Sequence, residues 1–220
     1  SSVLISMNGQ QFSSSGVEYT YVASASVSSV WPMSAAAEVS TPVTVSGSGF
    51  LSVSESLGYL QCRFNTTVVP AMYLSEEALL CNSSAGLSSG SVSVEVSLNG
   101  RDFTSDGGQV VLSDVLVGDV SPWSGPEQGG TVVTVSGSGL DSSLTSLSCR
   151  FGASASVQAS VHSSSEVRCV SPLDVLPTGW SVVELVSHGS SLRSGGSFYV
   201  HSRMWVSSVH PLLGPVVGGT

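Results

Sequence analysis

A repeat of about ninety residues constrains this chain more than any other feature. The heptapeptide Val-Thr-Val-Ser-Gly-Ser-Gly occurs at 43–49 and again at 133–139. A second phrase, Val-x-x-Val-x-Pro, occurs three times and ends at Pro32, Pro122 and Pro211. Self-similarity at a fixed period is the signature of an array of similar structural units. The chain is therefore predicted to contain tandem copies of one unit.

Further matching phrases set the boundaries of these units. Cys-Arg-Phe occurs at 62–64 and 149–151, and "SMNGQQF" (6–12) matches "SLNGRDF" (97–103). We predict two complete units, one before and one after residue 117, each flanked by part of another unit. The predicted segments are the C-terminal part of a preceding unit (1–25), two domains (26–116 and 117–204) and the start of a following unit (205–220).

Each unit has the pattern of a β-sheet protein. "TVVTVSG" and "SVSVEVSL" alternate with a period of two residues, as half-buried strands do. Asn99-Gly100 and Asn8-Gly9 are typical of hairpin turns, and Ser75–Leu80 is the only candidate for a helix. About seven short strands in ninety residues indicate a β-sandwich of immunoglobulin type. The predicted fold class is all-β, with sandwiches arranged end to end.

Charge excludes several kinds of partner. The formal net charge is −9, and all six basic residues are arginine. An acidic chain repels phosphate backbones, so we expect no nucleic acid partner. It also has no polybasic segment for an anionic membrane, and its apolar runs are far shorter than the roughly 18 residues of a membrane span. We expect no direct membrane contact from this segment.

The four cysteines occur as two pairs that follow the repeat. Four cysteines allow three connectivities, and the repeat favours Cys62–Cys81 and Cys149–Cys169, one bridge in each unit. Disulfides would indicate an oxidising compartment, whereas four reduced core cysteines would suit a cytosolic protein. A zinc site is less favoured, because no Cys-x-x-Cys spacing exists.

Two sequons for N-glycosylation flank cysteines of the first unit. They are Asn65-Thr66-Thr67 and Asn82-Ser83-Ser84, and we predict glycan on at least one. Such triplets also arise by chance in Ser/Thr-rich sequence. Together with the cysteine pairs and the absence of lysine, they favour a secreted or cell-surface protein.

No pattern in the sequence carries catalysis, and we expect no enzyme, no cofactor and no metal. The histidines are scattered, without the spacing of metal ligands, and are interpreted as surface or turn residues; they are His162, His188, His201 and His210. Tryptophans raise the hypothesis of sugar stacking, but Trp31 and Trp205 lie near unit junctions, where packing between domains is the favoured role.

The combined motifs resemble the IPT/TIG domain, an immunoglobulin-like fold shared by plexins and transcription factors. The second unit matches at Ser124-Gly125-Pro126, Gly129-Gly130-Thr131 and Ser171-Pro172, and also at Cys149, Phe151 and Cys169. In the first unit the stretch "SAAAEVST" replaces the Ser-Gly-Pro-x-x-Gly-Gly motif. The resemblance covers essentially the whole chain.

The resemblance implies a limited set of functions, because a fold shared so widely does not assign one. The leading hypothesis is a non-catalytic extracellular structural module within a long tandem array that forms a stalk or surface filament, such as a flagellar or ciliary mastigoneme. Its partners would be other subunits or copies of the same surface protein. The alternative is an ectodomain segment of a receptor similar to plexins, growth-factor receptors or fibrocystin, with a role in ligand binding or adhesion. A carbohydrate-binding module is a third hypothesis, which predicts exposed aromatic pairs.

Overall fold

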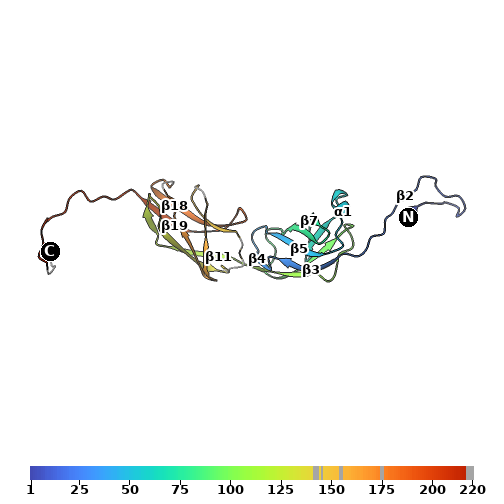
Figure 1. Ribbon diagram of the computed structural model, residues 1–220, viewed down its shortest axis with the longest axis horizontal. Coiled ribbons are helices and arrows are strands. Elements are labelled where there is room, and N and C mark those ends of the chain that lie inside the picture. Colours follow the sequence, from blue (N-terminus) through green and yellow to red (C-terminus); the bar gives the residue numbers. More distant parts are fainter. Residues whose placement is uncertain (141–143, 145, 154–155, 174–175, 217–220) are drawn as a thin grey trace. The chain divides into compact units, whose positions relative to one another are not determined.

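The regular secondary structure of the chain is almost entirely β-strand in a computed structural model (Figure 1). The structure describes residues 1–220 except 141–143, 145, 154–155, 174–175 and 217–220. A short antiparallel hairpin, β1 (Ser2–Val3) with β2 (Val17–Glu18), precedes the first repeat. The predicted all-β fold class is confirmed, with one helix of five residues in the described part of the chain.

The first repeat contains eight strands and the short helix α1 (Ser52–Ser56). Its strands are β3 (Ser26–Trp31), β4 (Ser34–Ala36), β5 (Pro42–Ser48), β6 (Gln61–Phe64), β7 (Thr67–Ser75), β8 (Ala78–Asn82), β9 (Gly90–Ser97) and β10 (Gly108–Ser113). They follow the spatial order β3-β5-β8-β7-β6-β9-β10-β4.

Strand β7 connects the two layers of the first sandwich. Its first half, Thr67–Pro70, pairs with β6, and its second half, from Ala71 onward, pairs with β8. One continuous strand therefore belongs to both layers, so the eight strands form one connected ladder rather than two separate sheets. Helix α1 packs against β7 (Figure 1).

The second repeat has the same layout, with nine strands. They are β11 (Leu116–Ser121), β12 (Ser124–Pro126), β13 (Val132–Ser138), β14 (Leu147–Phe151), β15 (Ser156–Gln158), β16 (Ser160–Ser163), β17 (Glu166–Val170), β18 (Gly179–Ser187) and β19 (Ser190–His201). A break at Ala159 divides the equivalent of β7 into β15 and β16. The sandwich accordingly has two sheets, β11-β13-β17-β16 and β12-β19-β18-β14-β15.

The two cores are built from equivalent positions. Alternation in the repeated heptapeptide buries Val43 and Val45 in one repeat and Val133 and Val135 in the other, all with no exposed surface. Further buried side chains occupy matching places in both repeats, and the pairs are Phe50/Leu140, Phe64/Phe151, Leu79/Val167, Val94/Val183, Val96/Leu185 and Leu112/Val200. Burial of this apolar surface is the main force that stabilises each sandwich.

Small details of the backbone repeat as well. The short strands β4 and β12 run parallel to β10 and β19, through the register pairs Ser34–Val111 and Ser124–Tyr199. The peptide bonds that precede the three repeated prolines are all cis. The third of them, Pro211, lies in the C-terminal segment, in which no strand is assigned between 202 and 216.

One local prediction was wrong. Residues 75–80 are not helical, because they form the end of β7, a turn and the start of β8, where pairing between strands outweighs local helix propensity. The turn predicted at Asn99-Gly100 is present, since Ser97 and Phe103 form an antiparallel bridge across it and Gly100 has a φ of +71°. Asn99 itself does not have a positive φ; its side-chain oxygen accepts hydrogen bonds from the amides of Arg101 and Asp102.

Candidate functional site

The histidines and carboxylates do not form a metal-binding cluster in the described part of the chain. No three His, Cys, Asp or Glu side chains gather there in a way that would hold a metal ion. His162 lies on β16, His188 in the turn between β18 and β19, and His201 at the end of β19. Partial burial lowers the pKa of His188 below its ordinary value of 6.5. His210 is exposed in the C-terminal segment.

Each repeat contains one disulfide that joins its two layers. Cys62 on β6 bonds to Cys81 on β8, and Cys149 on β14 bonds to Cys169 on β17. The Cα atoms lie 6.2 Å apart in both pairs, within the usual range for disulfides. All four residues are buried in the core.

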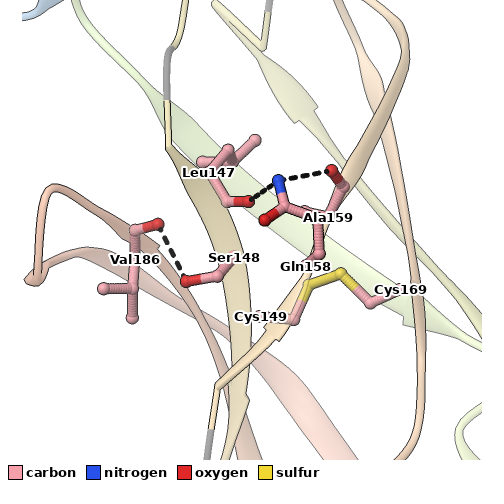
Figure 2. The surroundings of a disulfide bond; sticks show 7 residues. All are labelled: Leu147, Ser148, Cys149, Gln158, Ala159, Cys169 and Val186. Atoms are coloured by element: carbon pink, nitrogen blue, oxygen red, sulfur yellow. Dashed lines mark hydrogen bonds between the residues drawn. A yellow bond between two sulfur atoms is a disulfide. The ribbon is translucent and has the colours of Figure 1, made fainter.

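Polar groups line the disulfide of the second repeat at the edge of its sheet (Figure 2). The Nε2 atom of Gln158 donates to the carbonyl oxygen of Leu147 at 3.1 Å. The hydroxyl of Ser148 donates to the carbonyl oxygen of Val186 at 3.4 Å. These hydrogen bonds hold β15 and β18 beside β14, the strand that carries Cys149.

Asn65, the first sequon asparagine, occupies the tight turn between β6 and β7. Its φ is +52°, a conformation that asparagine tolerates better than most residues. Its Oδ1 accepts hydrogen bonds from the amide of Ser93 at 2.9 Å and from the hydroxyl of Ser93 at 3.2 Å. Gly152 takes the same place in the second repeat, with a φ of +56°. Asn65 is exposed, as a glycan acceptor must be.

Asn82, the second sequon asparagine, is the exposed last residue of β8. It follows Cys81, the cross-strand partner of Ala71 on β7. The next residue, Ser83, is buried, and its hydroxyl accepts a hydrogen bond from the amide of Thr41 at 2.9 Å. The asparagine side chain therefore projects from a backbone that is fixed on both sides.

Three aromatic residues meet on the exposed side of the second repeat. The rings of Trp123 and Trp180 are stacked, with centroids 6.1 Å apart and an angle of 27° between their planes. Tyr199 contacts Trp180 edge to face at 5.2 Å. The two indoles are 62% and 66% exposed. We refer to Trp123, Trp180 and Tyr199 as the aromatic face.

The first repeat has no aromatic face at the equivalent positions. The amide of Tyr199 donates to the carbonyl oxygen of Trp123, and the amide of Val111 donates to that of Met33, both at 2.8 Å. Met33 and Val111 therefore correspond to Trp123 and Tyr199. Ser91 follows the positive-φ Gly90 in the same way that Trp180 follows Gly179, so Ser91 corresponds to Trp180.

The first repeat instead exposes apolar side chains along β7. Alternate residues of this strand point to solvent, and each one is apolar. We call this set the β7 face; it consists of Val68, Pro70, Met72 and Leu74. The exposed fractions of Val68, Met72 and Leu74 lie between 46% and 50%. An exposed row of apolar side chains is a common feature of interaction surfaces.

The carbohydrate-binding hypothesis predicts exposed aromatic pairs, and Trp123 with Trp180 is such a pair, but the sequence does not identify its members. Only the pairing of β12 and β18 with β19 brings Trp123, Trp180 and Tyr199 together. The β7 face is not predicted. The signal for the β7 face was present, because Val68, Pro70, Met72 and Leu74 are spaced by two residues. Apolar residues at the intervening positions obscured it. Trp31 and Trp205 are 62% and 80% exposed.

Comparison with known proteins agrees with this geometry. The model of the IPT/TIG domain family matches residues 25–111 and 116–200. Human plexin-A3 is 27% identical over 183 residues, which is 80% of this chain and 10% of plexin-A3. Rat plexin-A3 is 25% identical over the same length and the same shares of each chain. The chain thus spans about one tenth of the length of the curated relatives it matches.

Solved structures show the same fold. The extracellular region of plexin A4, in a structure that contains domains 1 to 8, has a TM-score of 0.58 and 18% identity, covering 80% of this chain and 18% of that one. A second structure, with domains 1 to 10, also has a TM-score of 0.58, with 17% identity over 94% of this chain and 19% of that one. Among the described residues, no helix is long and apolar enough to cross a membrane.

Proposed function

Because the chain belongs to the IPT/TIG domain family, we propose that it is a non-catalytic segment of the extracellular part of a larger surface protein, in which the repeats form a stalk or filament. The observation that carries the proposal is the repetition itself. Two sandwiches with equivalent cores and one disulfide each follow one another in a single chain. Such a module spaces other parts of a protein without needing a reactive centre.

The short connection between the repeats supports a structural role. Strand β10 ends at Ser113 and β11 begins at Leu116, so only Asp114 and Val115 separate them. Short linkers restrict the orientations that two domains can sample, whereas flexible linkers broaden them. A chain of domains joined in this way transmits force and keeps its ends apart.

Solution scattering tests this role. A Gly-Ser-Gly-Ser insertion between Asp114 and Val115 is compared with the same insertion in the exposed turn between Gly86 and Leu87. We expect the linker insertion to broaden the distribution of particle dimensions and the turn insertion to leave it unchanged. Equal breadth for all proteins, the native chain included, would contradict a stiff stalk.

The disulfides support an extracellular location, because such bonds persist in oxidising compartments and are rare in the cytosol. The test is the intact mass of the protein recovered from the medium of secreting eukaryotic cells. Alkylation before reduction is expected to modify none of the four cysteines, and alkylation after reduction all of them. Modification of the unreduced protein would contradict the proposed location.

The aromatic face favours a second function, in which the segment also makes protein contacts within a receptor ectodomain. Tryptophan and tyrosine dominate the energetics of many protein interfaces, and these three rings lie together on an exposed surface. The simplest candidate partner is a second copy of this chain. A triple variant replaces the rings by the first repeat's residues: Trp123→Met, Trp180→Ser and Tyr199→Val. Sedimentation is expected to show self-association of the native chain and its loss in this variant, whereas equal association of both would contradict the role.

A further inference from the structure

The β7 face leaves apolar side chains exposed on a strand whose counterparts in the second repeat are polar. Strand β7 contains nine residues and no charged side chain. Each half pairs on only one side, with β6 or with β8, so within the described part of the chain its other backbone edge has no strand partner, and the five-residue helix α1 packs against β7. Long apolar strands with open edges promote pairing between molecules, and natural proteins cover or charge them.

The equivalent strands of the second repeat are polar on their outer side. Ala71 and Ala159 are both buried, and the amide of each donates to the carbonyl oxygen of a leucine, Leu60 and Leu147 respectively, over 3.1 Å. This match aligns β7 with β15 and β16 residue by residue. The residues that correspond to the β7 face are Ser156, Gln158, Ser160 and His162.

Both sequons of the chain lie beside the β7 face. Asn65 occupies the turn that leads into β7, three residues before Val68. Asn82 lies on β8 beside the middle of β7, directly after the residue that pairs with Ala71. The second repeat has Gly152 and Val170 at these positions and contains no sequon. Sequons and an apolar outer strand therefore occur together in one repeat, and both are missing from the other.

We propose that N-linked oligosaccharides on Asn65 and Asn82 cover the β7 face. This inference rests on the extracellular location proposed above. Sugar rings have apolar C–H faces, which pack on apolar side chains, and hydroxyl groups, which stay in water. Carbohydrate is bulky and solubilising, so it removes the strand from contact with other chains without occupying its hydrogen-bonding edge. The glycans thus keep the outer side of β7 from associating with other chains, as polar side chains do at the equivalent strands of the second repeat.

The geometry of Asn65 suits this role. The two hydrogen bonds from Ser93 hold the Oδ1 side of its amide, and the turn fixes its backbone. The attachment point is therefore held in place at the start of the strand. Asn82 is held similarly by the exchange of hydrogen bonds between Ser83 and Thr41. A glycan attached to a fixed asparagine samples a limited volume, and β7 lies within it.

The test removes the glycans without changing either asparagine. The variant Thr67→Ala/Ser84→Ala destroys both sequons, whereas the control Thr66→Ala leaves both intact. A third variant carries the second repeat's outer residues on β7: Val68→Ser, Pro70→Gln, Met72→Ser and Leu74→His. It is made alone and in combination with Thr67→Ala/Ser84→Ala. All proteins are the full chain, secreted from eukaryotic cells, and glycan occupancy is measured by intact mass.

Exposed apolar surface is measured by fluorescence of an apolar dye and self-association by sedimentation. We expect Thr67→Ala/Ser84→Ala to raise dye binding several-fold and to self-associate more than the native chain, and Thr66→Ala to match the native chain. The polar β7 variant is expected to associate no more than the native chain, with or without sequons. Enzymatic removal of the glycans from the native folded protein should reproduce the effect and excludes a defect in folding.

Three results would overturn the proposal. They are empty sequons in the secreted protein, unchanged dye binding after deglycosylation, and self-association of the glycosylated chain that the polar β7 variant abolishes. The last result would assign the β7 face to a second copy of the chain. Empty sequons in a secreted protein with both disulfides intact would end this inference and leave the proposed function standing.

Discussion

The carbonyl oxygen of Ser26 lies 2.0 Å from the point where a Cβ atom of Gly47 would be. The same relation holds in the second repeat, where the carbonyl oxygen of Leu116 lies 2.2 Å from the corresponding point of Gly137. These glycines stand at the same place in the repeated heptapeptide. Its first glycine is therefore required by the close approach of the neighbouring strand.

Substitution of either glycine by alanine should destabilise its own repeat. The added methyl group must displace backbone atoms, and overpacking of this kind costs about 1–3 kcal/mol. Gly118→Ala is the control, because the nearest atoms to its Cβ atom would be the Ser136 hydroxyl at 3.3 Å and the Ser136 carbonyl oxygen at 3.4 Å, both much farther than the carbonyl oxygen that faces Gly137. Unfolding in denaturant measures the free energy of unfolding of each variant. Equal losses for Gly137→Ala and Gly118→Ala would refute the steric explanation.

Reduction of the disulfides should destabilise the two repeats to a similar extent. The bridges close loops of nearly the same length, with sequence separations of 19 and 20 residues. Closing such a loop restricts the unfolded chain by about 3 kcal/mol. Unfolding is compared for Cys62→Ala/Cys81→Ala and Cys149→Ala/Cys169→Ala, with and without reductant. A variant that loses no stability would show that its bridge does not form.

Two related polar contacts should differ in strength. Arg150 forms an ion pair with Glu184 that is partly open to solvent, so Glu184→Gln should cost less than about 1 kcal/mol, and added salt should reduce the loss. In the first repeat the Thr104 hydroxyl donates to Glu95 and accepts from the amide of Val96. Thr104→Val leaves both partners unsatisfied and should cost about 1–3 kcal/mol. The reverse order of the two losses in urea unfolding would contradict this account.

His188 should make the second repeat less stable in mild acid. Burial lowers its pKa in the folded state below 6.5, so the folded state binds the proton less readily than the unfolded chain. The stabilisation is present above 6.5 and is lost as the pH falls through the lowered pKa. Asn99 takes the same place in the first repeat, and His188 has a φ of +49°, which asparagine accepts. His188→Asn should remove this pH dependence from the temperature of thermal unfolding. If the unfolding temperature of the variant depends on pH as that of the native chain does, groups other than His188 cause the dependence.

The sequence predicted those parts of the fold that depend on local pattern. Alternating valines in the repeated heptapeptide identified β5 and β13 and their buried faces, because strand alternation is a property of neighbouring residues. The family resemblance is confirmed by the match of the IPT/TIG model to both repeats. The break at Ala159, which separates β15 from β16 while β7 stays continuous, has no comparable local signal.

The surfaces could not be predicted in the same way. Trp123 and Tyr199 come from opposite ends of the second repeat, and only the parallel pairing of β12 with β19 makes them neighbours. Residues 75–80 were misassigned because glutamate, alanine and leucine favour helices in isolation, whereas here Leu79 completes the core from a strand. Contacts between distant segments decided both cases.

The disulfide that joins β6 to β8 has a mechanical consequence for a chain pulled from its two ends. Tension would peel away the strands outside the bridge, but the residues between Cys62 and Cys81 are bypassed by the covalent link. Each extended residue adds at most about 3.6 Å, so each bridge shortens the fully extended length of its repeat by roughly 60 Å. Because a repeat of about ninety residues could otherwise extend to roughly 320 Å, an array of such modules would reach its limit of extension about one fifth sooner than the same array without bridges.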